Sequence, residues 1–167
     1  MIRRLALASA LFVAVGSAAP SMAVADSNTS DLRISASVPN SCTISAGALD
    51  FGAYSPTTGI SVTGTVTTNC TVNANAVITL NQGVFSASGS SDTAPSRRLY
   101  NGNAGYLSYT LYQNSGKTTI WGNSTGTGVT VTGTGSNQST SVYGIIPAGQ
   151  SVPEGSYDDY VVATVTY

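Results

Sequence analysis

The two cysteines are the side chains of this sequence with the clearest chemistry. Cys42 and Cys70 are its only cysteines, and it contains no histidine. A zinc site usually needs four cysteine or histidine ligands, so this pair makes a poor metal site and favours a disulfide. Closing a loop of about 28 residues would contribute roughly 3.5 kcal/mol to the free energy of unfolding. Disulfides persist in oxidising compartments, so in an exported protein an even pair of cysteines most simply indicates one disulfide.

Carboxylates are the other side chains with catalytic potential. The absence of histidine excludes Ser–His and Cys–His nucleophile systems, which leaves a pair of acids of the glycosidase kind. Asp158 and Asp159 are adjacent, so on a strand they would point to opposite faces and could not share a site. We therefore expect no enzymatic activity, no cofactor and no metal. The acids considered are Asp50, Asp92, Glu154, Asp158 and Asp159.

The net charge of the chain limits the classes of partner that it can attract. It holds six Lys and Arg against seven Asp and Glu, a formal net charge of −1. Such a chain has no basic field for a nucleic acid, so we expect no nucleic-acid partner.

The first residues predict a secretory signal peptide. Arg3 and Arg4 precede an apolar run from Leu5 to Val15, and small residues follow it. This run is too short to span a bilayer, which takes about 20 residues. We expect cleavage after Ala25, which makes residues 1–25 the signal; cleavage after Ala23 is the alternative.

The elements that follow predict an all-β protein. Short segments rich in β-branched and aromatic residues alternate with Gly, Asn, Ser and Pro, and no long window has a helical period. This many short strands in a single domain indicate a β-sandwich. The expected strands lie in residues 48–54, 61–71, 75–83, 105–113, 118–122, 128–133, 140–146 and 158–167.

Two further segments are expected to be strands, but neither has an evident pairing partner. Leu32, Ile34, Ala36 and Val38 alternate with polar residues, as in a strand with one face meant for a core. At the other end, we expect residues 158–167 to form an apolar strand whose far edge is left uncovered. An exposed apolar edge is an aggregation hazard that proteins normally block.

These two segments suit each other as partners, either within a chain or between chains. The linker "PNS", residues 39–41, is short for a return across the same sandwich. Between chains, residues 31–38 would span about 27 Å of a sheet edge by β-strand addition. Because such a contact is head-to-tail and does not close on itself, it builds a filament.

The order of several motifs matches a known family. They are the alternating start leading into "SCTI", then "LDFGAYSP", "TVTTNCT", "RRLYNG", "LSYTLYQNSG", "WG" and the ending "VYGIIPAGQSVPEGSYDDYVVATVTY". With these motifs the chain resembles the spore coat protein U family, the pilin subunits of the archaic chaperone–usher pathway. The resemblance extends from Leu32 to Tyr167.

The resemblance implies an incomplete immunoglobulin-like β-sandwich, completed by a strand from a chaperone or a neighbouring subunit. The donor positions would be Leu32, Ile34, Ala36 and Val38, and Cys42 and Cys70 would tie the first strand to the sandwich. The implied partners are related pilin subunits, a periplasmic chaperone and an outer-membrane usher. The acceptor groove would be edged by Tyr160, Val161, Val162, Ala163, Val165 and Tyr167.

We therefore expect a signal peptide at residues 1–25, a donor extension and linker at 26–41, and a pilin domain at 42–167. The expected function is a structural subunit of a bacterial surface fibre that supports adhesion or biofilm formation. One alternative is a spore or surface coat protein that uses the same assembly. The other is a self-complete secreted β-sandwich that binds carbohydrate.

Overall fold

The computed structural model describes residues 24–167, so residues 1–23, nearly all of the predicted signal peptide, lie outside it. The described chain divides into two units, of which the second, residues 37–167, holds all of the strands. Within residues 24–167 no helix has both the length and the hydropathy to cross a membrane.

The second unit contains eight β-strands and one short 3-10 helix, η1, at Thr125–Thr127. The strands are β1 Cys42–Ala46, β2 Ile60–Cys70, β3 Asn75–Leu80, β4 Arg97–Tyr100, β5 Tyr106–Tyr112, β6 Val129–Thr132, β7 Gln138–Ile146 and β8 Ala163–Thr166.

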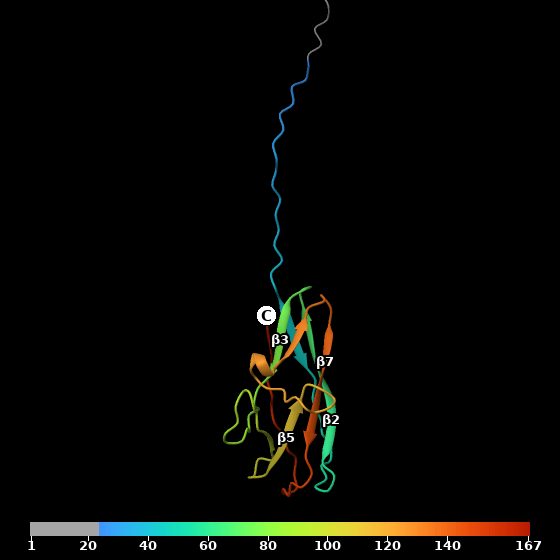
Figure 1. Ribbon diagram of the computed structural model, residues 1–167, viewed down its shortest axis with the longest axis vertical. Helices are drawn as coiled ribbons and strands as arrows, with labels where there is room; N and C mark the ends of the chain where they lie inside the picture. The colour runs from blue at the N-terminus through green and yellow to red at the C-terminus, as the bar shows by residue number, and fades with distance from the viewer. Residues whose placement is uncertain (1–23) are drawn as a thin grey trace, which may run out of the picture. The chain divides into compact units, whose positions relative to one another are not determined.

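The strands form two sheets (Figure 1). One sheet has the order β1-β2-β7-β5-β4 and the other has the order β6-β3-β8. All of the paired strands are antiparallel. The predicted all-β sandwich is therefore confirmed.

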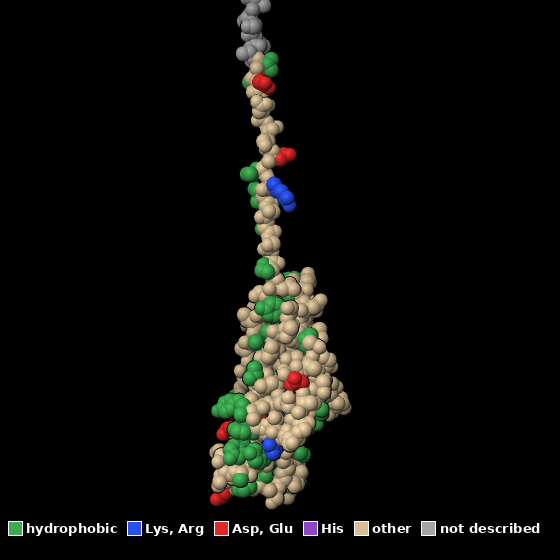
Figure 2. Space-filling view, turned by 90° about the vertical axis from the view of Figure 1, so that its left-hand side faces the viewer, with side chains coloured by type: hydrophobic (Ala, Val, Ile, Leu, Met, Phe, Trp, Pro, Cys, Tyr) green, Lys and Arg blue, Asp and Glu red, His purple; other side chains and the backbone are tan. Residues whose placement is uncertain are grey.

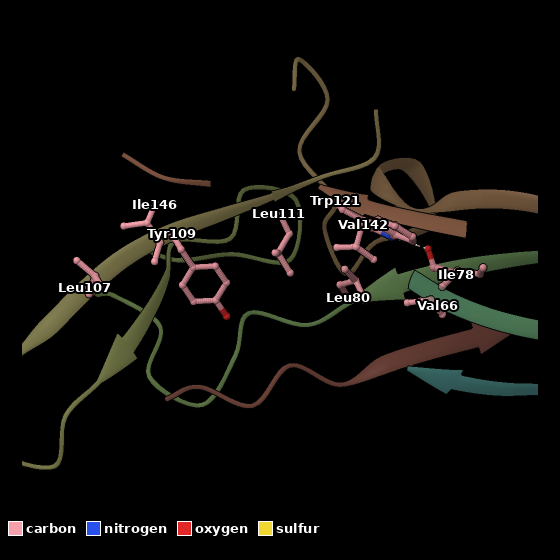
Figure 3. Close-up of a cluster of buried hydrophobic side chains, with 9 residues drawn as sticks. All are labelled: Val66, Ile78, Leu80, Leu107, Tyr109, Leu111, Trp121, Val142 and Ile146. Atoms are coloured by element: carbon pink, nitrogen blue, oxygen red, sulfur yellow. Dashed lines mark hydrogen bonds between the residues drawn. The ribbon is translucent and has the colours of Figure 1, made fainter. Parts of the chain in front are cut away.

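The core lies between the sheets because the strands alternate as the sequence predicts. In β5, for example, Leu107, Tyr109 and Leu111 are buried while Tyr106 and Ser108 are exposed. Trp121 is fully buried, and its indole Nε1 donates to the carbonyl of Ile78 at 2.9 Å. Figure 3 shows the central cluster: Val66, Ile78, Leu80, Leu107, Tyr109, Leu111, Trp121, Val142 and Ile146.

Two predicted strands are wrong. Residues 48–54 follow β1 without strand pairing, although Leu49 and Phe51 pack on the core. Residues 118–122 form only an isolated bridge, between Ile120 and Tyr112. Leu49 and Phe51 are partly buried by packing on the core, while Ile120 is exposed beside the buried Trp121. Composition does not distinguish such packing from pairing in a ladder. Conversely, β4 was not among the expected strands.

The extension in front of β1 carries no helix or strand over residues 24–41. Its apolar side chains are free: Leu32 is 84% exposed, Ile34 87% and Val38 80%. Figure 2 shows such hydrophobic side chains standing out along the extension, and others gathered toward the lower end of the domain. Large aliphatic side chains this exposed gain nothing from the hydrophobic effect until a partner covers them.

Candidate functional site

The candidate site is the side of the sandwich where β1 and β8 meet. β1 ends the five-stranded sheet and pairs only with β2, while β8 ends the three-stranded sheet and pairs only with β3. Figure 3 shows them side by side and running in opposite directions, β1 in teal and β8 in faint red. No ladder joins the two strands in the described chain, so each has one row of backbone groups available for pairing.

The two strands alone leave too little room for a third between them. Their Cα atoms approach within 8 Å of one another, whereas strands that flank a shared neighbour lie roughly 9.5 Å apart. A strand that pairs with both must therefore move β1 and β8 apart.

Next to the strands the site opens into a wide groove. This groove has a volume of about 1070 Å³ and lies between residues 46–56, which follow β1, and residues 152–161, which precede β8. Leu107, Leu111 and Ile146 are among the apolar residues that line it. A smaller hollow of about 90 Å³ adjoins it, lined in part by Val161 and Ala163. The groove offers space for several aliphatic side chains in a row.

The first wall of the groove is set by two glycines inside strands. Gly64 of β2 and Gly144 of β7 face the wall, and a Cβ at either would lie 2.6–2.8 Å from the side chain of Leu49. A Cβ at Gly144 would also come 2.9 Å from the ring of Phe51. A glycine in a strand often marks such a close approach. The two glycines let Leu49 and Phe51 lie on the sheet and hold residues 47–54 beside the groove.

The second wall begins where β8 loses regular pairing. The Asn81 backbone NH donates to the Val162 carbonyl at 3.0 Å, and the Val162 NH donates to Asn81 Oδ1 at 2.9 Å. A side-chain oxygen thus takes the place of a backbone carbonyl, so β8 starts at Ala163 rather than at Tyr160. Val161, Ala163 and Val165 pack against the core, whereas Tyr160, Val162 and Tyr167 are exposed.

The Asp159 carboxylate connects the second wall to two other parts of the domain through hydrogen bonds. Its Oδ1 accepts hydrogen bonds from the backbone NH groups of Val84 at 2.8 Å and Tyr160 at 2.9 Å. Its Oδ2 accepts the Tyr109 hydroxyl at 2.7 Å. Burial and the neighbouring carboxylate raise the pKa of Tyr109 well above its usual value. Tyr109 is therefore neutral and a hydrogen-bond donor at any physiological pH.

A buried arginine lies behind the same wall. Arg97 is 1% exposed, and its guanidinium donates to the carbonyls of Leu80, Asn81 and Trp121 at 2.7–2.9 Å. Desolvation lowers the pKa of Arg97 to about 10, although the negative charge of Asp159 acts in the opposite direction. These carbonyls lie at the end of β3 and beside it, so Arg97 fixes the strand against which β8 pairs.

The predicted disulfide is confirmed between Cys42 and Cys70. These two residues face each other at the first position of the β1–β2 ladder. The bond therefore fixes the start of β1, the strand at one side of the open edge.

Four of the carboxylates considered as catalytic groups line the groove, and Asp92 is not among its lining residues: the four are Asp50, Glu154, Asp158 and Asp159. Asp92 accepts from Gln82 and Asn123, and Asp50 accepts from the Gly52 backbone NH. Within residues 24–167 no three His, Cys, Asp or Glu side chains gather as metal ligands.

An aromatic group on β4 and β5 is held together by its own contacts. Tyr100 and Tyr106 stack with centroids 4.8 Å apart, and the Arg98 guanidinium lies 4.1 Å from the Tyr106 centroid. Arg98 and Tyr100 are both on one face of β4, and Tyr100 is the position opposite Tyr106. Contacts within the group thus occupy the ring faces that a sugar would need for stacking.

These features define an antiparallel β-sandwich whose edge strands β1 and β8 are, within the described chain, unpaired on their outer sides, with an uncovered apolar segment in front of the first strand. The chain belongs to the family described as the Spore Coat Protein U domain, whose model matches residues 28–164. The predicted family is therefore confirmed.

Known proteins that are similar to the chain include a curated sequence and a solved structure. "Protein U" of Myxococcus xanthus is 40% identical, over 95% of this chain and 96% of that protein. The second is a chain in the crystal structure of the CsuC–CsuE chaperone–tip adhesion subunit pre-assembly complex, from archaic chaperone-usher Csu pili of Acinetobacter baumannii. It has a TM-score of 0.54 and 22% identity, over 78% of this chain and 40% of that chain. The second likeness shows a shared immunoglobulin-like fold.

Tyr160 and Val161, which the sequence suggested for the edge of the acceptor groove, line the groove. Sequence reasoning missed the residues that shape its walls. Gly64 and Gly144 carried a usable signal, since glycine inside a strand pattern suggests a close approach. Asn81 and Asp159 carried none, because their partners are distant in the sequence.

Proposed function

We propose that this protein is a non-enzymatic structural subunit of a bacterial surface fibre, assembled by donor strand exchange. Residues 31–38 of one subunit insert between β1 and β8 of the next. The proposal rests on two complementary features of the same chain. One end presents an exposed alternating apolar segment, and the domain presents an unpaired sheet edge beside a wide groove lined in part by apolar side chains.

The chemistry of the two surfaces is complementary. Leu32, Ile34, Ala36 and Val38 would point into the groove, while Arg33, Ser35 and Ser37 would face outward. Backbone groups of the inserted strand would satisfy the free rows of β1 and β8. Burying each large aliphatic side chain contributes roughly 1.5–3 kcal/mol before ordering costs.

The proposed partners follow from this interface. An incomplete sheet edge needs protection before assembly, which a periplasmic chaperone would supply by lending a strand, and an outer-membrane usher would exchange it for the next subunit. The similar Csu complex holds a chaperone together with a pilus subunit, which supports the first step. The subunit would then reach the cell surface through the periplasm and support adhesion or biofilm formation.

A pair of substitutions on neighbouring positions tests the donor assignment. Ile34→Asp places a charge in the groove and should abolish polymerisation, because a carboxylate cannot be buried there without a partner. Ser35→Asp, on the opposite face of the same strand, should polymerise like the wild type. The measurement is the multimer distribution of surface material on a denaturing gel without heating. Equal polymerisation of the two variants would show that residues 31–38 are not the donor strand.

A coat layer is the second candidate, favoured by the family's description as a spore coat protein. The strand-exchange interface would be identical, and only the higher-order arrangement would differ. Immunogold electron microscopy distinguishes the two: thin labelled filaments indicate a pilus, and a continuous labelled layer indicates a coat.

A further inference from the structure

The open edge lies directly beside β1, the strand that follows the extension. A hairpin loop over the linker, residues 39–41, would therefore bring the extension back along β1 into the groove of its own chain. Three-residue hairpin loops are common, so linker length alone does not prevent this self-insertion. A subunit that filled its own groove could not accept a neighbour.

The structure holds the linker in a different conformation. The Thr71 backbone NH donates to the Ser41 carbonyl at 2.9 Å, and the Ser41 NH donates to Thr71 Oγ1 at 3.1 Å. The Thr71 hydroxyl in turn lies 3.3 Å from the Ser41 carbonyl and 3.4 Å from the Pro39 carbonyl, which share it as acceptors. These contacts extend the β1–β2 register by one pair beyond Cys42 and Cys70.

Thr71 is on the β2 side of β1, away from β8. Its hydrogen bonds hold the linker in line with β1 as far as Pro39, whereas a hairpin loop needs residues 39–41 to turn toward β8. Pro39 adds stiffness because its ring fixes φ and restricts Val38 to extended conformations.

We infer that Thr71 is a positioning residue that directs the extension away from its own groove and keeps the subunit competent to join two neighbours. This inference rests on the proposed strand exchange. In this role Thr71 and Pro39 favour polymerisation over self-insertion, and neither residue belongs to the strand-exchange interface.

The test measures how much of the full-length mature chain can capture a donor peptide. The chain is refolded at high dilution, which favours self-insertion, and a labelled peptide of residues 28–38 is then added. Thr71→Val keeps the size of the side chain and removes the hydroxyl. We expect the fraction that fails to capture peptide to rise about fivefold, the effect of one net hydrogen bond. Thr71→Ser keeps the hydroxyl and should match the wild type, and Pro39→Gly should act like Thr71→Val.

A background that cannot self-insert separates positioning from structural damage. In full-length chains that carry Ile34→Asp, Thr71→Val should leave peptide capture unchanged. If Thr71→Val reduces capture in that background as well, Thr71 is merely structural and the inference is overturned. Equal capture by Thr71→Val and wild type in the original background overturns it too. If the Ile34→Asp chain itself captures no peptide, the groove is not an acceptor, and the proposed function fails together with the inference.

Discussion

The two ends of the five-stranded sheet differ in how their edges are protected. At β4, the backbone of Tyr100 exchanges two hydrogen bonds with Asp158, at 2.9 and 3.1 Å. The Arg98 guanidinium holds the carbonyls of Phe85 and Ser86, so that the loop before β4 lies against it. At β1, the opposite end, no described segment pairs with the outer edge.

The edge at β4 is therefore protected by contacts that the edge at β1 lacks within residues 24–167. The same sequence covers β4 with a loop and a charged side chain, which are devices that proteins use against edge-to-edge association. It leaves β1 and β8 unblocked, with a wide groove beside them. An unpaired edge of this kind can accept a strand from a partner.

The largest of the expected effects on the isolated domain comes from the disulfide that fixes the open edge. Replacing Cys42 and Cys70 together by serine should lower the free energy of unfolding by about 3.5 kcal/mol, because the unfolded chain regains the entropy of a closed loop. Urea unfolding measures the loss. Amide exchange should accelerate more in β1 than in β4; equal acceleration at both edges would show that the bond does not stabilise β1 in particular.

A second change tests the groove wall on β8. Val161→Lys should weaken capture of the donor peptide about 100-fold, because an ammonium group would have to be buried against an aliphatic strand. Val162→Lys is the matched control, since this neighbouring side chain is 58% exposed. Peptide titration by fluorescence polarisation gives both affinities. Similar losses in the two variants would place the acceptor surface elsewhere.

A third change weakens the protected edge. Arg98→Ala removes two hydrogen bonds to backbone carbonyls and the contact with Tyr106, so we expect a loss of about 1–2 kcal/mol in unfolding free energy. Amides of residues 84–87 should exchange faster while peptide capture is unchanged. Arg33→Ala, in the exposed extension, should alter neither quantity. A fall in peptide capture with Arg98→Ala would mean that the two edges are coupled.

The smallest expected effect concerns Tyr109 and depends on pH. Tyr109→Phe removes the hydrogen bond to Asp159 and should cost about 1 kcal/mol near neutral pH. The pKa of Tyr109 is raised in the folded state, so the unfolded chain releases this proton first and the wild type loses stability above pH 10. The difference between wild type and variant should therefore shrink by about 1 kcal/mol between pH 10 and 11. A difference independent of pH would show that Tyr109 ionises equally in both states.

Alternation and cysteine count predicted much of the fold from the sequence. β2, β5 and β7 carry long runs of β-branched and aromatic residues, and the two cysteines left one obvious disulfide. β4 was missed because it begins with Arg97 and Arg98, and arginine is almost never fully buried without partners. Those partners are carbonyls that only the folded chain brings together.

The sequence predicted the two segments that would pair at the candidate site, but not the residues that form its groove. The alternation in residues 31–38 and the apolar final strand were enough to suggest β-strand addition. The groove depends on Leu49 and Phe51 lying over Gly64 and Gly144, and on Asn81 replacing a backbone partner of Val162. These are contacts between residues up to about a hundred positions apart, which local patterns do not encode.

Surface-sheared material from the producing cells, run on a denaturing gel without boiling and without reductant, tests strand exchange most directly. Our account predicts a ladder of multimers containing this chain that collapses to monomer on boiling, because the subunits are joined by non-covalent strands. A single monomer band from folded, soluble protein would contradict it. The extension would then pair within its own domain, and a self-complete binding module would become the better description.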